Sequence, residues 1–195
     1  MLIIVGKNSQ LYQRYQNEYN IECIEVSHDQ LGEYNFSKFD EVVLFSYSKK
    51  MEQNTTLLSH LARNVRKIKI IGSAAVFSPV ASRFNYSRSK LQQLNIAQVL
   101  SKEEGCSIAY GIFGSFTPID RIGYYYKSDL TDLHDFIIKD CRAGIINHAK
   151  LDGTDLTTSQ KKQYTFVNFL LTPKLAGVYY KIFTKYNYGY NIVIK

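Results

Sequence analysis

The 195-residue sequence has few cysteines and histidines, and their placement excludes several classes of protein. Cys23, Cys106 and Cys141 lie far apart and are odd in number, so they do not form the framework of a disulfide-rich domain. The four histidines are scattered singly, without the paired spacing of a structural zinc site. We therefore expect reduced, buried thiols in a cytoplasmic protein, and no structural metal.

Long apolar runs are also missing. No segment comes near the roughly 18 consecutive apolar residues that suggest a membrane-spanning helix. The chain begins at once with the apolar run 2–5, without the basic region and cleavage site of a signal peptide. With 45% hydrophobic and 21% charged residues, the composition is that of a globular protein, and the length suits one domain with a substantial core.

Acidic residues are absent from residues 156–195, which contain six lysines. The formal net charge is +7, so subtracting these six charges leaves +1 for residues 1–155. The lysines are interspersed with tyrosines and aliphatic residues, which suits peripheral contact with an anionic membrane surface. It equally suits a helix and an edge strand packed on the domain. Nucleic-acid binding is not expected, because no recognised module accompanies the basic residues.

Apolar runs alternate with segments of helical periodicity along residues 1–115. Strands are expected at 2–5, 21–26, 41–45, 68–71 and 106–113, and helices at 13–19, 53–65 and 86–102. This alternation predicts an α/β fold, a doubly wound parallel sheet with helices on both faces. Residues 116–195 are expected to form a reduced C-terminal portion of one compact domain. The interval 30–40 is short for a full helix and strand, so the fold is expected to be trimmed there.

Three residues of this framework suggest chemistry. Ser73 follows the apolar run 68–71, and Tyr86 and Lys90 lie four residues apart on one face of the next predicted helix. An ammonium beside a phenol favours the phenolate, which makes Tyr86 a candidate proton donor or acceptor. Ser73, at the carboxyl end of a strand, is placed to hold a substrate oxygen. In a chain with 16 tyrosines, the Tyr-Lys spacing alone also fits two unrelated helix residues.

The segment GSAAVFS at 72–78, followed by YSRSK at 86–90, resembles the active-site region of the short-chain dehydrogenase/reductase superfamily. Extended members of that family carry S-x-x-V-Y-G and then Y-x-x-S-K. The resemblance implies a Rossmann-like fold and an NAD- or NADP-dependent reductase, dehydrogenase or epimerase that acts on a nucleotide-linked sugar, often in surface polysaccharide synthesis. It assigns substrate orientation to Ser73, proton exchange to Tyr86, and both phenol activation and contact with the nicotinamide ribose to Lys90.

The same resemblance points to a cofactor site after the first strand. Gly6 matches the first glycine of the family's phosphate-binding turn, whereas Ser9 and Tyr12 replace the second and third. Gln10 and Leu11 are similar to the G-Q-L of sugar-nucleotide reductases. A tyrosine at the third position is expected to push helix and strand apart or to swing out.

Other candidate positions follow along the chain. Asp29 lies about 20 residues beyond the turn, where an acidic residue binds the adenosine ribose, although Lys7 would suit a 2′-phosphate. Arg121 and Tyr124, in a tyrosine-rich loop, are candidate substrate contacts. Tyr110 takes the place of the arginine in the family's R-x-x-x-x-G-P segment.

Two glycines of the family's turn are replaced, and the C-terminal portion is small. These two features favour an alternative function that is not enzymatic. In that alternative, the chain is a non-catalytic binding or scaffold subunit with the same fold, and its basic tail holds a partner or a membrane. By analogy with extended relatives, a homodimer through the helix that carries Tyr86 and Lys90 is expected. Location in the cytoplasm, with peripheral contact at the inner membrane face, would suit either function.

Overall fold

The computed structural model describes residues 1–27, 30, 34–37, 40–45, 51–77, 85–103, 106–116, 125–140 and 142–152. Its elements, in chain order, are β1 (Leu2–Val5), α1 (Gln10–Tyr19), β2 (Ile24–Val26), β3 (Glu41–Leu44), α2 (Met51–Asn64), β4 (Lys67–Ile71), the short 3-10 helix η2 (Ala74–Phe77), α3 (Asn85–Glu103), β5 (Ser107–Ile112), β6 (Tyr125–Lys127), α4 (Leu130–Ile138), β7 (Gly144–Asn147) and β8 (Lys150–Asp152).

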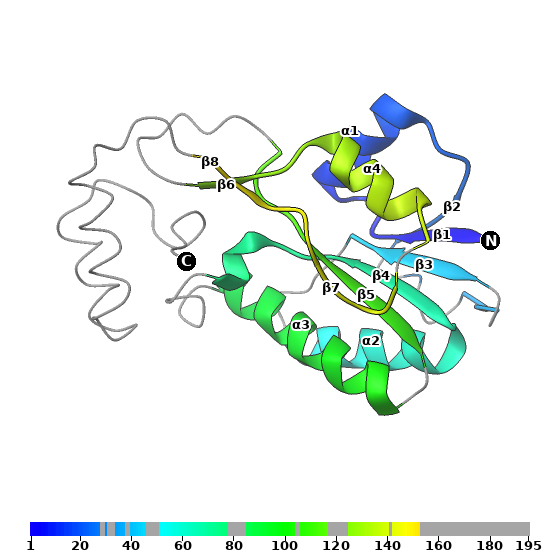
Figure 1. Ribbon diagram of the computed structural model, residues 1–195. Helices are drawn as coiled ribbons and strands as arrows, with labels where there is room; N and C mark the ends of the chain where they lie inside the picture. Colours follow the sequence, from blue (N-terminus) through cyan, green and yellow to red (C-terminus); the bar gives the residue numbers. More distant parts are fainter. Residues whose placement is uncertain are drawn as a thin grey trace, which may run out of the picture.

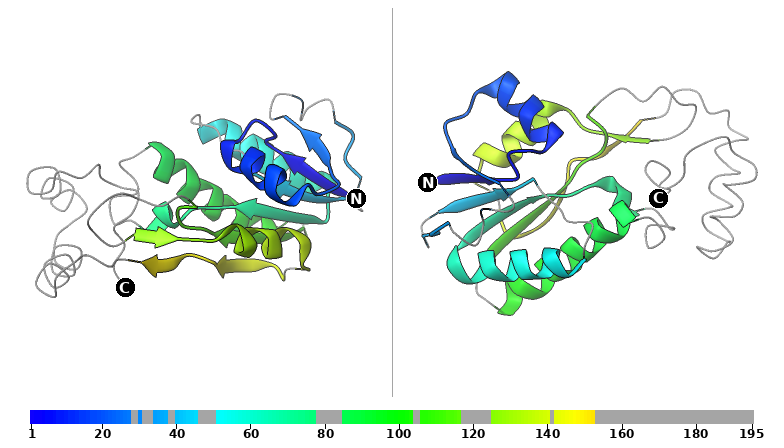
Figure 2. Two further views of the ribbon diagram at one scale, coloured as in Figure 1. Left: turned by 90° about the horizontal axis from the view of Figure 1, so that it is seen from above. Right: turned by 180° about the vertical axis from the view of Figure 1, so that it is seen from behind.

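Six of the strands form one parallel sheet in the order β2-β1-β3-β4-β5-β7. Helices α1 and α4 cover one face of this sheet, and α2 and α3 cover the other (Figure 1). The view from behind shows the same three layers (Figure 2). The predicted doubly wound, Rossmann-like sheet with helices on both faces is therefore confirmed.

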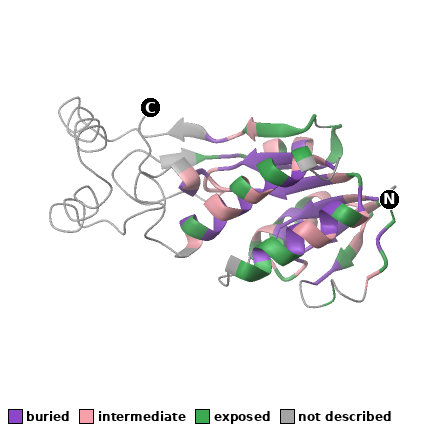
Figure 3. Cartoon of the chain, turned by 90° about the horizontal axis from the view of Figure 1, so that it is seen from below, coloured by how far each residue is buried: buried purple, intermediate pink, exposed green. Residues whose placement is uncertain are grey.

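The sheet is parallel because its strands are apolar on both faces, as burial between two helix layers requires. In β3, Val42 and Leu44 belong to the core beneath α2 and α3, whereas Val43 belongs to the core beneath α1 and α4. In β4, Ile68 and Ile70 pack in the first core and Ile71 in the second. Buried residues are concentrated in the central strands (Figure 3).

The order of strands reverses direction between β1 and β3. At such a switch point, the loops that leave the carboxyl ends of neighbouring strands run to opposite faces and open a crevice for a ligand. Between β2 and β3, the described residues 30, 34–37 and 40 contain no strand, which agrees with the predicted trimming. Among the described strands, β2 is the edge of the sheet on this side.

A second, two-stranded sheet joins β6 and β8 antiparallel to each other. Ser128, which follows β6, fastens this part to the main sheet. Its Oγ accepts a hydrogen bond from the backbone N of Gly114 at 2.9 Å and donates one to the backbone O of His148 at 2.9 Å. The hydroxyl thus joins the segments that leave β5 and β7.

An ion cluster around one buried lysine joins the amino ends of the central strands to α4. Lys69, only 1% exposed, donates from Nζ to the backbone O of Ile137 at 2.6 Å and of Lys139 at 2.8 Å, and also pairs with Glu41. Lys67 pairs with Glu41 at 3.2 Å and with Asp140. Lys69 therefore supplies donors to carbonyls at the C-terminal end of α4, which lack partners within the helix.

Candidate functional site

Ser73 lies at the carboxyl edge of the sheet, two residues beyond the end of β4. The backbone N of Gly72 still donates to the O of Gly111 at 2.7 Å, which continues the pairing with β5 up to this point. The chain then turns into η2, and the Oγ of Ser73 accepts a hydrogen bond from the backbone N of Ala75 at 3.2 Å. The half-buried hydroxyl still has its own proton to donate to a substrate oxygen.

Lys90 extends from the second turn of α3 to the same strand end. Its side chain is 4% exposed, and its Nζ donates a hydrogen bond to the backbone O of Ile71 at 2.9 Å. The ammonium thus lies against the last residue of β4, two positions before Ser73. Tyr86 is half-buried, one helical turn before Lys90 on the same face of α3. The structure therefore gathers Lys90 and Ser73 at one strand end, with Tyr86 on the helix that delivers Lys90.

The surroundings of Lys90 change its acid-base chemistry. Burial disfavours the charged form and lowers the pKa of the Lys90 ammonium to about 7. Buried polar side chains accompany it in the first turns of the two packed helices, namely Asn54 of α2 and Ser87, Ser89 and Gln93 of α3. A lysine with this pKa changes its charge close to neutral pH.

Tyr110 of β5 is a component of the site whose role the sequence pattern did not reveal. Its side chain is 2% exposed, and its Oη donates a hydrogen bond to the backbone O of Lys90 at 3.0 Å. The ring lies against Gly72, where any added Cβ would overlap it. This close approach explains why a glycine precedes Ser73.

A tight turn follows β1 at the position where the sequence predicts phosphate binding. Gly6 has φ of 101°, a backbone conformation that favours glycine, and its N donates to the O of Val26 at 2.9 Å. Ser9, the N-cap of α1, makes no capping hydrogen bond with its side chain, and the first turn contains no acidic residue. Gln10 and Leu11 then open the helix. The N–H groups of this first turn have no partner within the helix, so they suit a phosphate.

Tyr12, at the position of the third glycine, is part of the core between α1 and the sheet, together with Ile4 and Val43. The ring is 2% exposed and packs edge-on against Phe45, with ring centres 5.2 Å apart. Its Oη donates to the Glu25 carboxylate on β2. Burial, together with Cys23 and Glu25, raises the pKa of this phenol far above its ordinary value. Of the two outcomes expected for this tyrosine, the outward swing is wrong, because the ring is buried in the core between α1 and the sheet.

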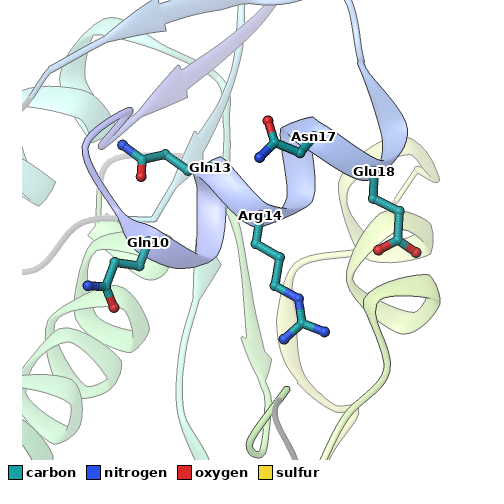
Figure 4. Close-up of a pocket in the computed structure, with 5 residues that line it drawn as sticks. All are labelled: Gln10, Gln13, Arg14, Asn17 and Glu18. Atoms are coloured by element: carbon teal, nitrogen blue, oxygen red, sulfur yellow. The ribbon is translucent and has the colours of Figure 1, made fainter.

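A shallow hollow of about 520 Å3 runs along the outer face of α1 (Figure 4). All its lining residues come from this one helix: Gln10, Gln13, Arg14, Asn17 and Glu18. Arg14 donates from its guanidinium to the backbone O of Phe116 at 3.0 Å. None of Ser73, Tyr86 and Lys90 lines the hollow, so we assign neither cofactor nor substrate to it.

Several predicted positions lie outside the described residues. These are Asp29, Arg121, Tyr124 and the basic segment 156–195. Their assignments, and the expected contacts with a membrane or a second copy, stay predictions. Within the part of the chain that is described, no helix is both long enough and apolar enough to cross a bilayer.

The parallel six-stranded sheet, its switch point and its crossover helices define this chain as a Rossmann-like α/β protein. No protein-family model matches the sequence, and no curated protein sequence matches it. Solved structures do share the fold. UDP-N-acetylglucosamine 4-epimerase from Bacillus cereus superposes with a TM-score of 0.54 at 13% identity, over 85% of this chain and 83% of the epimerase.

RMD from Pseudomonas aeruginosa, solved in complex with NADPH, has a TM-score of 0.56 at 11% identity, over 85% of this chain and 80% of that protein. The capsular polysaccharide assembling protein CapF from Staphylococcus aureus has a TM-score of 0.51 at 14% identity, over 96% of this chain and 66% of CapF. At these identities the similarity establishes the fold. The resemblance inferred from the sequence is thus confirmed at the level of the fold.

Proposed function

We propose that this chain is a small, extended-type short-chain dehydrogenase/reductase that uses NAD or NADP to act on a nucleotide-linked sugar as a reductase, dehydrogenase or epimerase. The observation that carries the proposal is the placement of Lys90, whose buried ammonium meets the end of β4 at 2.9 Å, beside Ser73. Burying a lysine costs free energy, and a buried lysine with a lowered pKa at the carboxyl end of a parallel strand is a candidate functional residue.

The proposed chemistry moves a proton at a sugar oxygen. When a sugar hydroxyl is oxidised, Tyr86 as phenolate accepts the hydroxyl proton, and in the reverse direction the phenol returns it. Ser73 donates a hydrogen bond to the same oxygen and orients it. Lys90, when protonated, favours the phenolate form of Tyr86. A nicotinamide cofactor supplies the hydride chemistry when bound.

The cofactor would be held mainly through the turn after β1. The left-handed Gly6 lets the chain reverse sharply, and the backbone N of Ser9 closes this turn by donating to the O of Gly6 at 2.9 Å. The N-terminal amides of α1 at Gln10 and Leu11, with the side chain of Ser9, would bind the pyrophosphate. Asp29 is proposed for the adenosine ribose and Lys90 for the nicotinamide ribose.

The substrate class follows the proteins that share the fold. Among them are an epimerase of UDP-N-acetylglucosamine and a protein of capsular polysaccharide assembly, which supports a nucleotide-linked sugar and a role in surface polysaccharide synthesis. We propose Arg121 and Tyr124 as substrate contacts, because a guanidinium and a phenol suit a pyrophosphate and sugar hydroxyls.

The test begins with binding. Purified protein is titrated with NADH and NADPH, and saturable binding should raise the melting temperature by mass action. A panel of UDP-, GDP- and dTDP-linked sugars is then assayed with both cofactors at 340 nm, and by NMR for epimers. Tyr86→Phe should lower turnover by about 10²- to 10⁴-fold with cofactor affinity retained. The matched control Tyr19→Phe, on α1, should leave turnover unchanged; an active Tyr86→Phe would remove this residue from the chemistry.

A second candidate function is a non-catalytic Rossmann-fold binding subunit. The observation in its favour is the turn after β1, where Ser9 and Tyr12 keep side chains at positions of the second and third glycines. This function predicts no binding of NADH or NADPH, even at millimolar concentration. The binding titration therefore separates the two candidates before any substrate is known.

A further inference from the structure

Tyr110 is a buried residue that touches both the segment before Ser73 and the turn of α3 that carries Tyr86 and Lys90. It lies in β5, paired with Ile70 of β4, and its ring packs against Gly72, the residue before Ser73. Its hydroxyl donates to the backbone O of Lys90 at 3.0 Å. Burial, and after it the charge of Tyr86, raise the pKa of Tyr110.

Two hydrogen bonds in opposite directions join this turn of α3 to the sheet. The Nζ of Lys90 donates to the backbone O of Ile71 on β4, and the backbone O of Lys90 accepts from Tyr110 on β5. The carbonyl of Lys90 also belongs to the helix ladder, so the phenol adds a second donor to an oxygen with two lone pairs. Without the phenol, this turn would lose one of these two bonds to the sheet.

We propose that Tyr110 is a positioning residue that fixes the turn of α3 bearing Tyr86 and Lys90 against the strand end that carries Ser73. The inference rests on the proposed function of these three residues. It adds a role for a residue at the position where the extended family carries an arginine. Because catalysis needs its groups held within a fraction of an ångström, a single anchor of this kind affects turnover more than binding.

The test uses the full chain and Tyr110→Phe, which keeps the ring against Gly72 and removes only the hydroxyl. With the panel sugar that turns over fastest, kcat should fall by about fivefold to tenfold, and KM should stay within about twofold. A second readout needs no substrate. NMR titration of lysine labelled with 13C at Cε, assigned with Lys90→Met, should show that the pKa of Lys90 rises from about 7 toward its ordinary value as water reaches the loosened turn.

Tyr15→Phe is the matched control. Tyr15 is an equally buried tyrosine on α1, on the face of the sheet opposite α3, and its hydroxyl lies 2.9 Å from the Nδ1 of His134 (Figure 1). It should leave kcat and the titration of Lys90 unchanged. Gly72→Ala provides an independent variant, because its Cβ displaces the Tyr110 ring and should reproduce the loss of kcat and the rise in pKa.

The outcomes separate this inference from the proposed function. If Tyr86→Phe is inactive while Tyr110→Phe keeps the wild-type kcat and the wild-type titration of Lys90, the positioning role is overturned and the proposed function stands. If Tyr86→Phe is fully active, the proposed function fails. An unchanged titration of Lys90 in Tyr110→Phe then also rejects Tyr110 as the anchor of this turn.

Discussion

Replacing Lys90 with methionine should change how the free energy of unfolding depends on pH. Burial lowers the pKa of this ammonium to about 7 in the folded protein, whereas the exposed lysine of the unfolded chain titrates near 10.5. Between these two values the unfolded chain binds a proton that the folded protein does not, so stability rises with pH. The cost of the buried lysine is complete below pH 7 and disappears above pH 10.5.

The size of the effect follows from the two pKa values. One pKa unit corresponds to about 1.4 kcal/mol, so between pH 7 and pH 9 the wild type should gain about 2 kcal/mol relative to Lys90→Met. Urea unfolding at several pH values, followed by circular dichroism, measures this difference. Groups that titrate in both proteins contribute equally to the two free energies of unfolding, so they cancel in the difference. One of them is the Cys23 thiol, whose pKa is raised by burial. If the free energies of unfolding of the two proteins changed in parallel with pH, the lowered pKa of a buried Lys90 would be refuted.

Three further predictions concern stability and assembly. Lys69→Met should cost about 2–3 kcal/mol because it leaves the carbonyls of Ile137 and Lys139 without their donor, whereas Lys139→Met, at an exposed pair with Asp135, should cost under about 0.5 kcal/mol; equal losses in urea unfolding would contradict the capping role. Gly6→Ala should cost about 1–2 kcal/mol because of the positive φ, while Ser9→Ala should be nearly neutral; a neutral Gly6→Ala would argue against the left-handed turn. If the chain dimerises through α3, Val99→Glu at a 51% exposed position should give a monomer in light scattering, and a monomeric wild type would reject that expectation.

The alternation of strands and helices could be predicted because both signals are local. A buried parallel strand is a continuous apolar run, as in β3, and the next helix has its own period. The trimmed interval before β3 followed from its length alone. The candidate site could also be predicted from the sequence, because Ser73 follows the end of a strand and Tyr86 and Lys90 share a helix face.

Features that depend on distant partners were not predicted. Lys69 interrupts an apolar run, and its burial is made tolerable by the carbonyls at the end of α4 and by the carboxylate of Glu41 on the neighbouring strand β3. Tyr110 has no local pattern that reveals its bond to Lys90, 20 residues away in sequence. The pairing of β6 with β8 joins segments on either side of α4 and β7, and neither three-residue strand is long enough to show a period.

The two ends of β4 have different roles, one in stability and one in the proposed chemistry. Its amino end bears the ion cluster of Lys67 and Lys69, and its carboxyl end leads to Ser73 and receives Lys90. From Lys69 to Ser73 the chain rises about 13 Å, farther than the distance within which substitutions usually couple. Changes at the two ends should therefore combine additively. An engineer who needs a sturdier protein can redesign the salt-bridged end and leave the chemistry of the other end untouched.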